Sequence, residues 1–520
     1  MTARRKAGSR VRMITLAAVL GASILSAALP AAAASLASQV DDYRATHEAV
    51  IVSRLDELAR INSVAADPAG LSMAADYLKT QLQQRGFDAQ EFTADPGAPP
   101  AVFGSLKTPG AKRTVIFYAH YDGQPVTPSQ WSSDPFVPVM RSGPLHSGEH
   151  DIDWQSVHGP FDPEWRFFAR AVSDDKASII AFLAAFDALK ATDVRPSVNI
   201  KVLWEGEEEA GSSHLAAILR SHRALLAADL ILIGDGPVHQ SRRPMIYFGA
   251  RGVMGLDATI YGPLRALHDG HYGNWVPNPA AMAATLIAQM RDDEGRILIP
   301  GFADGVRPLA AAEQLAIRNL PPIDDALKRE FGIGRTEGNE GLALSLMRPA
   351  LNIRGIRSGD VGAAAANAIP TTATISFDFR LVPDQSPAAV RAAVERFLQA
   401  HGWTIVADEP DAATRAREHR LIRLKWDGGY PALRSDLSSA TARAVIAAAG
   451  NAAAVPVVVM PMMGGSVPLY EIAEVLKVPV IGLPIVNHDN SQHAPNENLR
   501  LRNLWDGIDS YAAMLAGLTW

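Results

Sequence analysis

Residues 177–209 read ASIIAFLAAFDALKATDVRPSVNIKVLWEGEEE, and this stretch decides the fold class. It predicts a helix over 177–189 and an apolar strand over 198–204, which ends in four carboxylates within five residues. Short apolar strands of the same kind are expected at 114–118 and 230–233. Strands that alternate with helices are typical of a parallel or mixed sheet covered by helices, so we expect an α/β fold.

The pattern changes after Asp235, where alternating strands are expected at 253–261 and 371–382. Such strands, with helices between them, are typical of a smaller α+β domain with an antiparallel sheet. The alternation of helix and strand resumes near Ser435, so one domain is inserted into another. The predicted division is residues 35–241 and 431–520 for the first domain and residues 242–430 for the inserted domain.

Composition narrows the functional classes. A chain of 520 residues exceeds one hydrophobic core, and 48% hydrophobic with 20% charged residues is typical of a globular protein. The net charge is −6 and there is no long basic tract, so nucleic acid is not expected as a partner. The sequence contains no cysteine, so any metal must be held by His, Asp and Glu side chains.

The N-terminus has the layout of a secretory signal peptide. Five basic residues among the first twelve precede an apolar stretch from about Met13 to Leu29, and Pro30 with four alanines follows. We predict a signal peptide over residues 1–34 and a periplasmic or secreted protein. The alternative is an uncleaved membrane anchor, but the apolar run is short for a membrane span. After cleavage, no membrane association is expected.

Five motifs carry chemistry, and most of them follow predicted strands. They are YAHYDG around His120, VSDDK around Asp174, WEGEEEAGS around Glu208 and Glu209, GDG around Asp235, and NHDNSQHAPNE around His493. Taken alone, the His120 motif is explained about as well by a surface turn, the Asp174 motif is better explained by helix capping, and Asp235 and His493 by ordinary turns and loops. A solvated loop would explain the Glu208 motif, but the strand before it and the Gly-Ser after it favour a site. Together they supply two imidazoles and three carboxylates at strand ends, where open α/β sheets place their ligands. This set suits two divalent cations that share one bridging carboxylate.

From about residue 45 to the C-terminus, the chain resembles the M20 family of metallopeptidases. That family includes carnosinase-like dipeptidases, glutamate carboxypeptidases and aminoacylases. The order and context of all five motifs agree, and WSSDPF at 131–136 and FDFRLVP at 377–383 are further family-like segments. The resemblance implies a dinuclear-metal catalytic domain with a helix-covered mixed sheet, interrupted by a smaller ferredoxin-like lid and dimerisation domain.

The resemblance also implies roles for single residues. His120 and Asp235 would bind one metal ion, Glu209 and His493 would bind the other, and Asp174 would bridge them. Glu208 would be the general base on a metal-bridging water, and Asp122 would orient His120. Zinc is the expected metal, and manganese or cobalt would suit the same ligands.

The inserted domain carries further residues that match family segments. His268, in LHDG, would reach the active site of a partner subunit in a homodimer and stabilise the tetrahedral oxyanion. Arg380 and the loop GGSVP, with Gly465 and Ser466, would bind a substrate carboxylate.

Several positions depart from the family pattern. Ala177 follows Lys176 where relatives carry glycine, and Met462 stands where many dipeptidase-like relatives have arginine. About twenty extra residues at 140–163 form either a rim loop that shapes access or a plain surface insertion. Asp235 resembles the peptidase-type members, in which this acid is Asp rather than Glu.

The leading hypothesis is therefore an exported two-metal hydrolase that cleaves the amide bond of short peptides. The alternative is an N-acyl-amino-acid amidohydrolase with the same site, for which an N-acyl amino acid would be the substrate. A catalytically inactive peptide-binding relative is a further hypothesis, but all five predicted ligands and Glu208 are present.

Overall fold

The computed structural model describes residues 35–520, so the predicted signal peptide over 1–34 lies outside the described residues. The chain from Leu36 to Trp520 forms one compact unit. Among residues 35–520, no helix combines the length and the apolar character that a membrane span requires.

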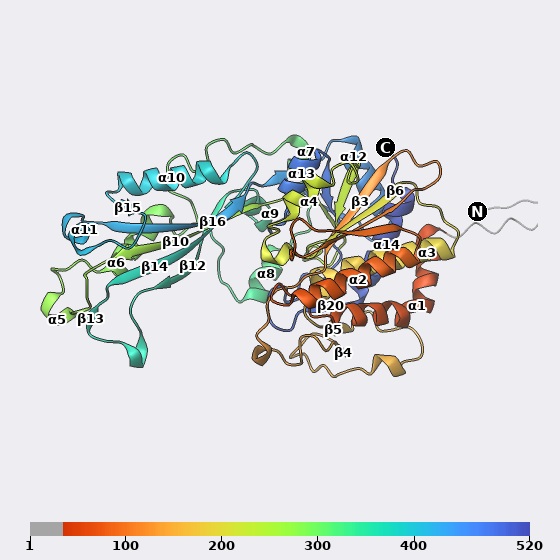
Figure 1. Cartoon of the computed structure of the whole chain (residues 1–520), viewed down its shortest axis with the longest axis horizontal. Helices are drawn as coiled ribbons and strands as arrows, with labels where there is room; N and C mark the ends of the chain where they lie inside the picture. Colours follow the sequence, from red (N-terminus) through yellow and green to blue (C-terminus); the bar gives the residue numbers. More distant parts are fainter. Residues whose placement is uncertain (1–34) are drawn as a thin grey trace, which may run out of the picture. The chain divides into compact units, whose positions relative to one another are not determined.

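An eight-stranded mixed sheet forms the centre of the larger part of this unit (Figure 1). Its strands, in spatial order, are β1 (Asp88–Phe92), β2 (Ala101–Leu106), β6 (Asn199–Glu205), β3 (Thr114–His120), β7 (Leu230–Ile233), β19 (Val480–Gly482), β8 (Met245–Tyr247) and β18 (Val458–Met460). The central pairs β6–β3, β3–β7 and β7–β19 are parallel, whereas β1–β2 and β2–β6 are antiparallel. The predicted mixed α/β fold is thus confirmed.

Helices cover both faces of this sheet, which explains why its strands are continuously apolar. In β3, Phe117 contributes to the apolar core on one face, and Ile116 contributes to the core on the other. The first face is covered by α1 (Leu36–Ala59), α2 (Pro68–Gln84), α3 (Ala177–Ala191), α12 (Ala440–Ala452) and α14 (Leu501–Gly517). The second face is covered by α4 (Leu215–Ser221) and α13 (Leu469–Leu476).

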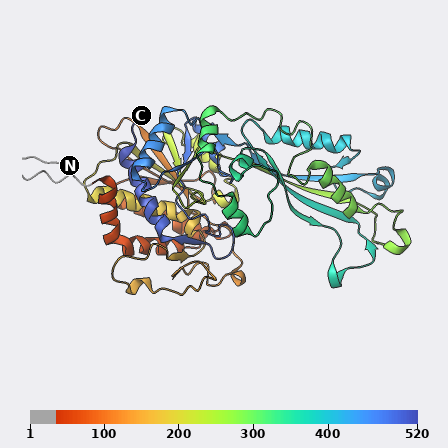
Figure 2. The same cartoon turned by 180° about the vertical axis from the view of Figure 1, so that it is seen from behind.

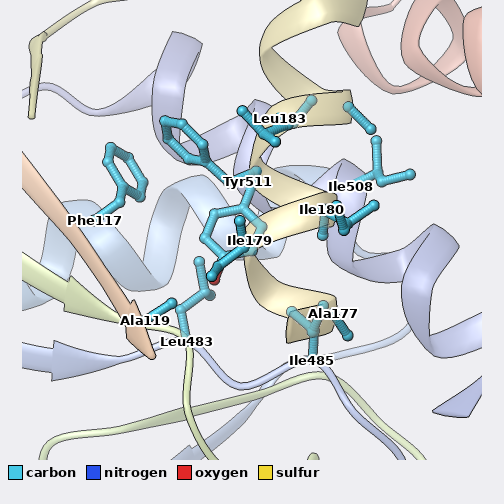
Figure 3. Close-up of a cluster of buried hydrophobic side chains, with 14 of the residues drawn as sticks. Phe117, Ala119, Ala177, Ile179, Ile180, Leu183, Leu483, Ile485, Ile508 and Tyr511 are labelled. Atoms are coloured by element: carbon cyan, nitrogen blue, oxygen red, sulfur yellow. The ribbon is translucent and has the colours of Figure 1, made fainter. Parts of the chain in front are cut away.

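Within the core on the first face, α3 packs against α14 (Figure 3). Ile180 and Leu183 of α3 lie near Ile508 and Tyr511 of α14, and Phe117 of β3 lies beside them. All five side chains are almost fully buried. The helix α3 begins at Ala177, directly after the VSDDK motif that contains Asp174. This packing therefore fixes the start of α3 next to the motif.

The inserted segment forms a five-stranded sheet. Its strands, in spatial order, are β12 (Ala350–Arg357), β14 (Thr372–Leu381), β10 (Gly252–Tyr261), β16 (Leu421–Tyr430) and β15 (Thr404–Val406). The helices α6 (Pro279–Met290) and α10 (Pro387–Ala400) pack on one face, and α10 lies along the strands in both views (Figure 2). The order β10–α6–β12–β14–α10–β16 is the βαββαβ arrangement of ferredoxin-like domains, as expected.

Shorter elements complete the fold. A three-stranded sheet contains β4 (Val139–Arg141), β5 (Arg166–Phe168) and β20 (Asn498–Arg500). One two-stranded ribbon pairs β9 (Gly249–Ala250) with β17 (Leu433–Arg434). The other pairs β11 (Leu267–His268) with β13 (Ala368–Ile369). The short helices are α5 (Asp269–Tyr272), α7 (Ala311–Arg318), α8 (Asp324–Phe331), α9 (Leu342–Leu346) and α11 (Ala412–Arg417).

The division into residues 35–241, 242–430 and 431–520 stays a prediction, since Leu36–Trp520 is one compact unit. Strand pairing does show where the chain moves from one sheet to the other. β8 pairs with β18 and β19 of the large sheet, so the chain stays in that sheet up to Tyr247. The next strand of five or more residues is β10, which begins at Gly252 in the five-stranded sheet.

The register of the parallel strands brings the predicted motifs together. His120, the last residue of β3, is paired with Glu205, the last residue of β6. β7 runs parallel to β3 and ends at Ile233, two residues before Asp235. The carboxyl ends of three parallel strands therefore deliver the YAHYDG, WEGEEEAGS and GDG motifs to one edge of the sheet.

Candidate metal centre

Asp174 lies at the centre of the candidate site. Its Oδ1 is 3.1 Å from Nε2 of His120, and its Oδ2 is 3.0 Å from Nε2 of His493. Gln492 donates a hydrogen bond from Nε2 to the same Oδ2, at 2.5 Å. One carboxylate thus contacts both predicted histidine ligands, which are 373 residues apart in the sequence (493 minus 120).

Two groups of potential ligands share Asp174. The first group contains His120, Asp174 and Asp235, and the second contains Asp174, Glu209 and His493. In each group, one ligand atom of each residue lies within 4.8 Å of those of the other two. In the second group Nε2 of His493 is 3.2 Å from Oε2 of Glu209. The structure thus brings together all five residues that the sequence predicts as metal ligands, with the predicted bridging carboxylate common to both groups.

Asp122 organises this site from behind. Its Oδ1 lies 3.3 Å from Nδ1 of His120, so the other ring nitrogen faces Asp174. The two carboxylate oxygens of Asp122 also accept the backbone N–H groups of Glu208 and Glu209, at 3.1 and 2.9 Å. A single buried side chain therefore fixes the histidine and the acidic turn after β6 together.

The charge balance of the site fits divalent cations. Burial and repulsion from Asp174 raise the pKa of Asp235 to about 7. Burial also opposes ionisation of Asp174, but hydrogen bonds with His120 and His493 hold its pKa below the ordinary value. Within residues 35–520, no Lys or Arg forms an ion pair with Asp174, Glu209 or Asp235. Apart from the two histidines, these carboxylates have no cationic partner, and two hard-to-borderline divalent ions would balance their charge.

Glu208 lies beside these ligands and lines a cavity with Asp174 and Asp235. Burial raises the pKa of Glu208 well above its ordinary value, as does repulsion from Asp235 and Glu209. A carboxylate whose pKa is moved toward neutrality is suited to accept and return a proton. Its neighbour Glu207 instead pairs with His214, at 2.8 Å.

A buried carboxylate not assigned a role from the sequence, Glu497, joins the two loops that carry Asp174 and His493. Its Oε2 accepts hydrogen bonds from Nη1 of Arg170 and from the backbone N–H of Ala171, at 2.8 and 3.0 Å. Its Oε1 accepts hydrogen bonds from the backbone N–H and the Oγ of Ser173, and from the backbone N–H of Asp174, at 2.9, 2.8 and 3.0 Å. Glu497 therefore holds the backbone of Asp174 in place.

Two glutamines were also not predicted. Gln492 contacts Asp174, and Gln124 donates a hydrogen bond from Nε2 to Oε2 of Glu209 at 2.8 Å. Their only signal in the sequence is proximity to the motifs, since Gln492 precedes His493 and Gln124 follows YAHYDG.

The cavity beside the metal ligands has a volume of about 670 Å³. Arg380, near the end of β14, lines it together with Gly465 and Ser466, as the sequence predicts for a carboxylate-binding group. Arg380 donates hydrogen bonds from Nη1 to Oγ of Ser466, at 2.8 Å, and from Nε to Asp378, at 2.9 Å. Tyr430, at the end of β16, lines the cavity as well and was not predicted.

Two predicted features lie away from this cavity. His268, on β11, does not line it, and 56% of its side chain is exposed. No residue of the 140–163 insertion lines it either, which favours a plain surface insertion over a rim loop. Phe161 of the insertion donates its backbone N–H to Glu48 of α1.

Comparison with known proteins decides the family. The profile of peptidase family M20/M25/M40 matches residues 116–517. The chain belongs to this family. The predicted M20 membership and peptidase class are thus confirmed.

Relatives match over nearly the whole chain. The Cys-Gly metallodipeptidase dug1 of Schizosaccharomyces pombe is 26% identical over 476 residues, covering 88% of this chain and 93% of the relative. The human Beta-Ala-His dipeptidase is 26% identical over 517 residues, covering 93% of each chain. The M20 family metallo-carboxypeptidase Sso-CP2 of Sulfolobus solfataricus superposes with a TM-score of 0.73 at 26% identity, covering 90% of this chain and 98% of that chain.

The departures from the M20 pattern have simple structural settings. Ala177 is the first residue of α3 and is fully buried in the core. Met462, which stands where many dipeptidase-like relatives have arginine, is fully buried in a small apolar cluster with Met347, Val382 and Ala432. It does not line the cavity, so Arg380 remains the arginine there.

Proposed function

We propose that this M20 metallopeptidase is a dipeptidase that hydrolyses the peptide bond of short peptides with a free C-terminal carboxylate. The observation that carries the proposal is one cavity lined by three of the five predicted metal ligands, by Glu208 and by Arg380. The dipeptidase names of the matching relatives support this substrate class over the N-acyl-amino-acid alternative. The complete set of ligands argues against an inactive relative.

The residues divide the reaction between them. Two divalent ions, for which zinc is our expectation, would polarise the scissile carbonyl and lower the pKa of a bound water. Glu208 accepts a proton from the attacking water as the oxygen–carbon bond forms, and returns it to the amine nitrogen as the carbon–nitrogen bond breaks. Arg380, oriented by Asp378 and Ser466, holds the substrate carboxylate in the same cavity.

We further propose export and a homodimer. The basic and apolar leader of the sequence supports export to the periplasm or the medium. The high exposure of His268, which lies away from the cavity of its own chain, supports a role for this side chain at the site of a second copy. Exposed apolar residues on the same segment, such as Trp275 with 80% exposure, support a protein contact there.

The test compares hydrolysis of dipeptides and N-acyl amino acids by zinc-loaded protein and two matched variants. Glu208→Gln should lower kcat by roughly 10²- to 10⁴-fold, because it removes the proton acceptor and keeps the shape. Glu207→Gln changes the adjacent carboxylate, which pairs with His214, and should retain activity. Cleavage of N-acyl amino acids alone would favour the amidohydrolase, and full activity of Glu208→Gln would refute the assigned base.

A further inference from the structure

Much of the wall of the cavity that holds Asp174, Asp235 and Arg380 is apolar. Met245 of β8 and Met460 of β18 lie at the edge of the large sheet, and Met463 and Val467 flank the glycine loop that precedes Ser466. All four side chains line the cavity and are at least nine-tenths buried. They belong to the apolar core on the second face of the sheet, so their positions are fixed by packing.

A second apolar surface comes from the inserted segment and faces the same cavity. Ile323, which precedes α8, and Leu342 and Leu346 of α9 line it. The start of α8 and the start of α9 are joined by a hydrogen bond from the backbone N–H of Leu342 to Asp324, at 3.1 Å. We call residues 323–346 the roof segment.

The roof segment is in contact with the glycine loop. A Cβ atom at Gly464 would lie 2.8 Å from Cδ2 of Leu346, so the loop and the helix meet without space for a side chain. Leu346 also packs against two apolar clusters, one on the large sheet and one that contains Met462. The roof segment is therefore held next to Ser466, which accepts a hydrogen bond from Arg380.

Few of the side chains that line this cavity are charged. The ionisable acids and His493 belong to the metal centre, and Arg380 is the one arginine among the lining residues. His239 also lines it, and burial lowers its pKa to about 4, so it is neutral at pH 7. A charged side chain of the substrate placed against the methionines and leucines would lose its hydration without a partner.

We propose that the roof segment and the methionines form a subsite for a bulky apolar side chain, such as that of leucine, methionine or phenylalanine. The side chain belongs to the C-terminal residue of the substrate, because the apolar surface adjoins the loop next to the arginine that holds its carboxylate. This inference rests on the proposed dipeptidase function. The volume of about 670 Å³ is within the range of small-molecule sites.

The test measures kcat/KM of zinc-loaded protein for four dipeptides: Ala-Leu, Leu-Ala, Ala-Ala and Ala-Lys. We expect Ala-Leu to exceed each of the others by about 30-fold or more, because a single methylene in an apolar pocket is worth roughly 10-fold or more. Equal values for Ala-Leu, Ala-Ala and Ala-Lys would overturn the subsite while leaving the dipeptidase function intact. A preference for Leu-Ala would overturn its assignment to the C-terminal residue. Failure to cleave any dipeptide would refute the proposed function itself.

A pair of variants on one helix tests the roof segment directly. Leu342→Arg places a cation in the subsite, so the ratio of kcat/KM for Ala-Leu to that for Ala-Glu should fall by about 100-fold. Leu344→Arg is the matched control, since Leu344 belongs to the same helix, is 39% exposed and does not line the cavity. Circular dichroism of both variants checks folding. An unchanged ratio in a folded Leu342→Arg protein would overturn the proposal.

Discussion

Glu497→Gln is the perturbation whose effect follows most fully from the structure. The side chain accepts five hydrogen bonds, three at Oε1 and two at Oε2. Replacing either oxygen by an amide NH₂ group leaves at least two buried donors facing another donor, even if Ser173 rotates its hydroxyl. An unsatisfied buried donor costs about 1–3 kcal/mol, so the free energy of unfolding should fall by about 2–6 kcal/mol.

The same substitution should disturb catalysis at temperatures where the variant is fully folded. If the amide NH₂ takes the place of Oε1, the backbone N–H of Asp174 loses its acceptor; if it takes the place of Oε2, the neighbouring N–H of Ala171 does. Either arrangement disturbs the backbone that holds the bridging carboxylate between His120 and His493. Urea denaturation measures the stability, and competition with a chelator measures zinc affinity. The control is Glu474→Gln, since Glu474 is 57% exposed and pairs only with Lys477 on the surface.

If the free energy of unfolding falls by less than about 1 kcal/mol, the count of unsatisfied donors is wrong. A large fall in stability with unchanged zinc affinity and unchanged kcat would show that Glu497 supports the fold without positioning Asp174.

Two further predictions concern other carboxylates. Asp122→Asn should lower zinc affinity by about 10- to 100-fold, because the carboxylate orients His120 and holds the turn at Glu208. Competition with a chelator measures this affinity. The control Asp134→Asn, at an exposed surface position, should leave zinc affinity unchanged. Asp509 of α14 belongs to neither group of metal ligands, and burial with repulsion from Asp41 raises its pKa to about 7 in the folded protein. Because this folded-state pKa exceeds that of the unfolded chain, ionisation of Asp509 costs stability progressively as the pH rises from about 4 to 7. Asp509→Asn should therefore raise the free energy of unfolding by about 2–4 kcal/mol at pH 8 and change it little at pH 4; an equal effect at both pH values would contradict the assigned cause.

The elements that the sequence predicts well are those buried on both faces or along one full face. The strand expected at 230–233 is β7 with the same bounds, and the helix expected at 177–189 is α3, Ala177–Ala191. Their apolar runs are unambiguous because helices cover both faces of the sheet. The sequence also favours a helix over 215–226, but α4 ends at Ser221, since tertiary contacts decide where a short helix stops.

The positions of the metal ligands could be predicted because each follows a recognisable strand or motif. Glu497 could not be assigned a role, because its partners Arg170 and Asp174 are 327 and 323 residues away and no local pattern connects them. The roof segment was also not predicted. Its helices α8 and α9 contain only eight and five residues, so their apolar residues have no measurable periodicity.

The two-metal site is tested by counting the zinc ions bound per chain and measuring dipeptide hydrolysis on the same preparation. We expect two ions for the natural sequence. In His493→Gln one ion should be lost together with activity, because His493 belongs to only one of the two ligand groups. His214→Gln, which changes a histidine paired with Glu207 outside both groups, should keep two ions and full activity. Fewer than two ions in the natural protein, or two ions and unchanged hydrolysis in His493→Gln, would contradict the two-metal peptidase site.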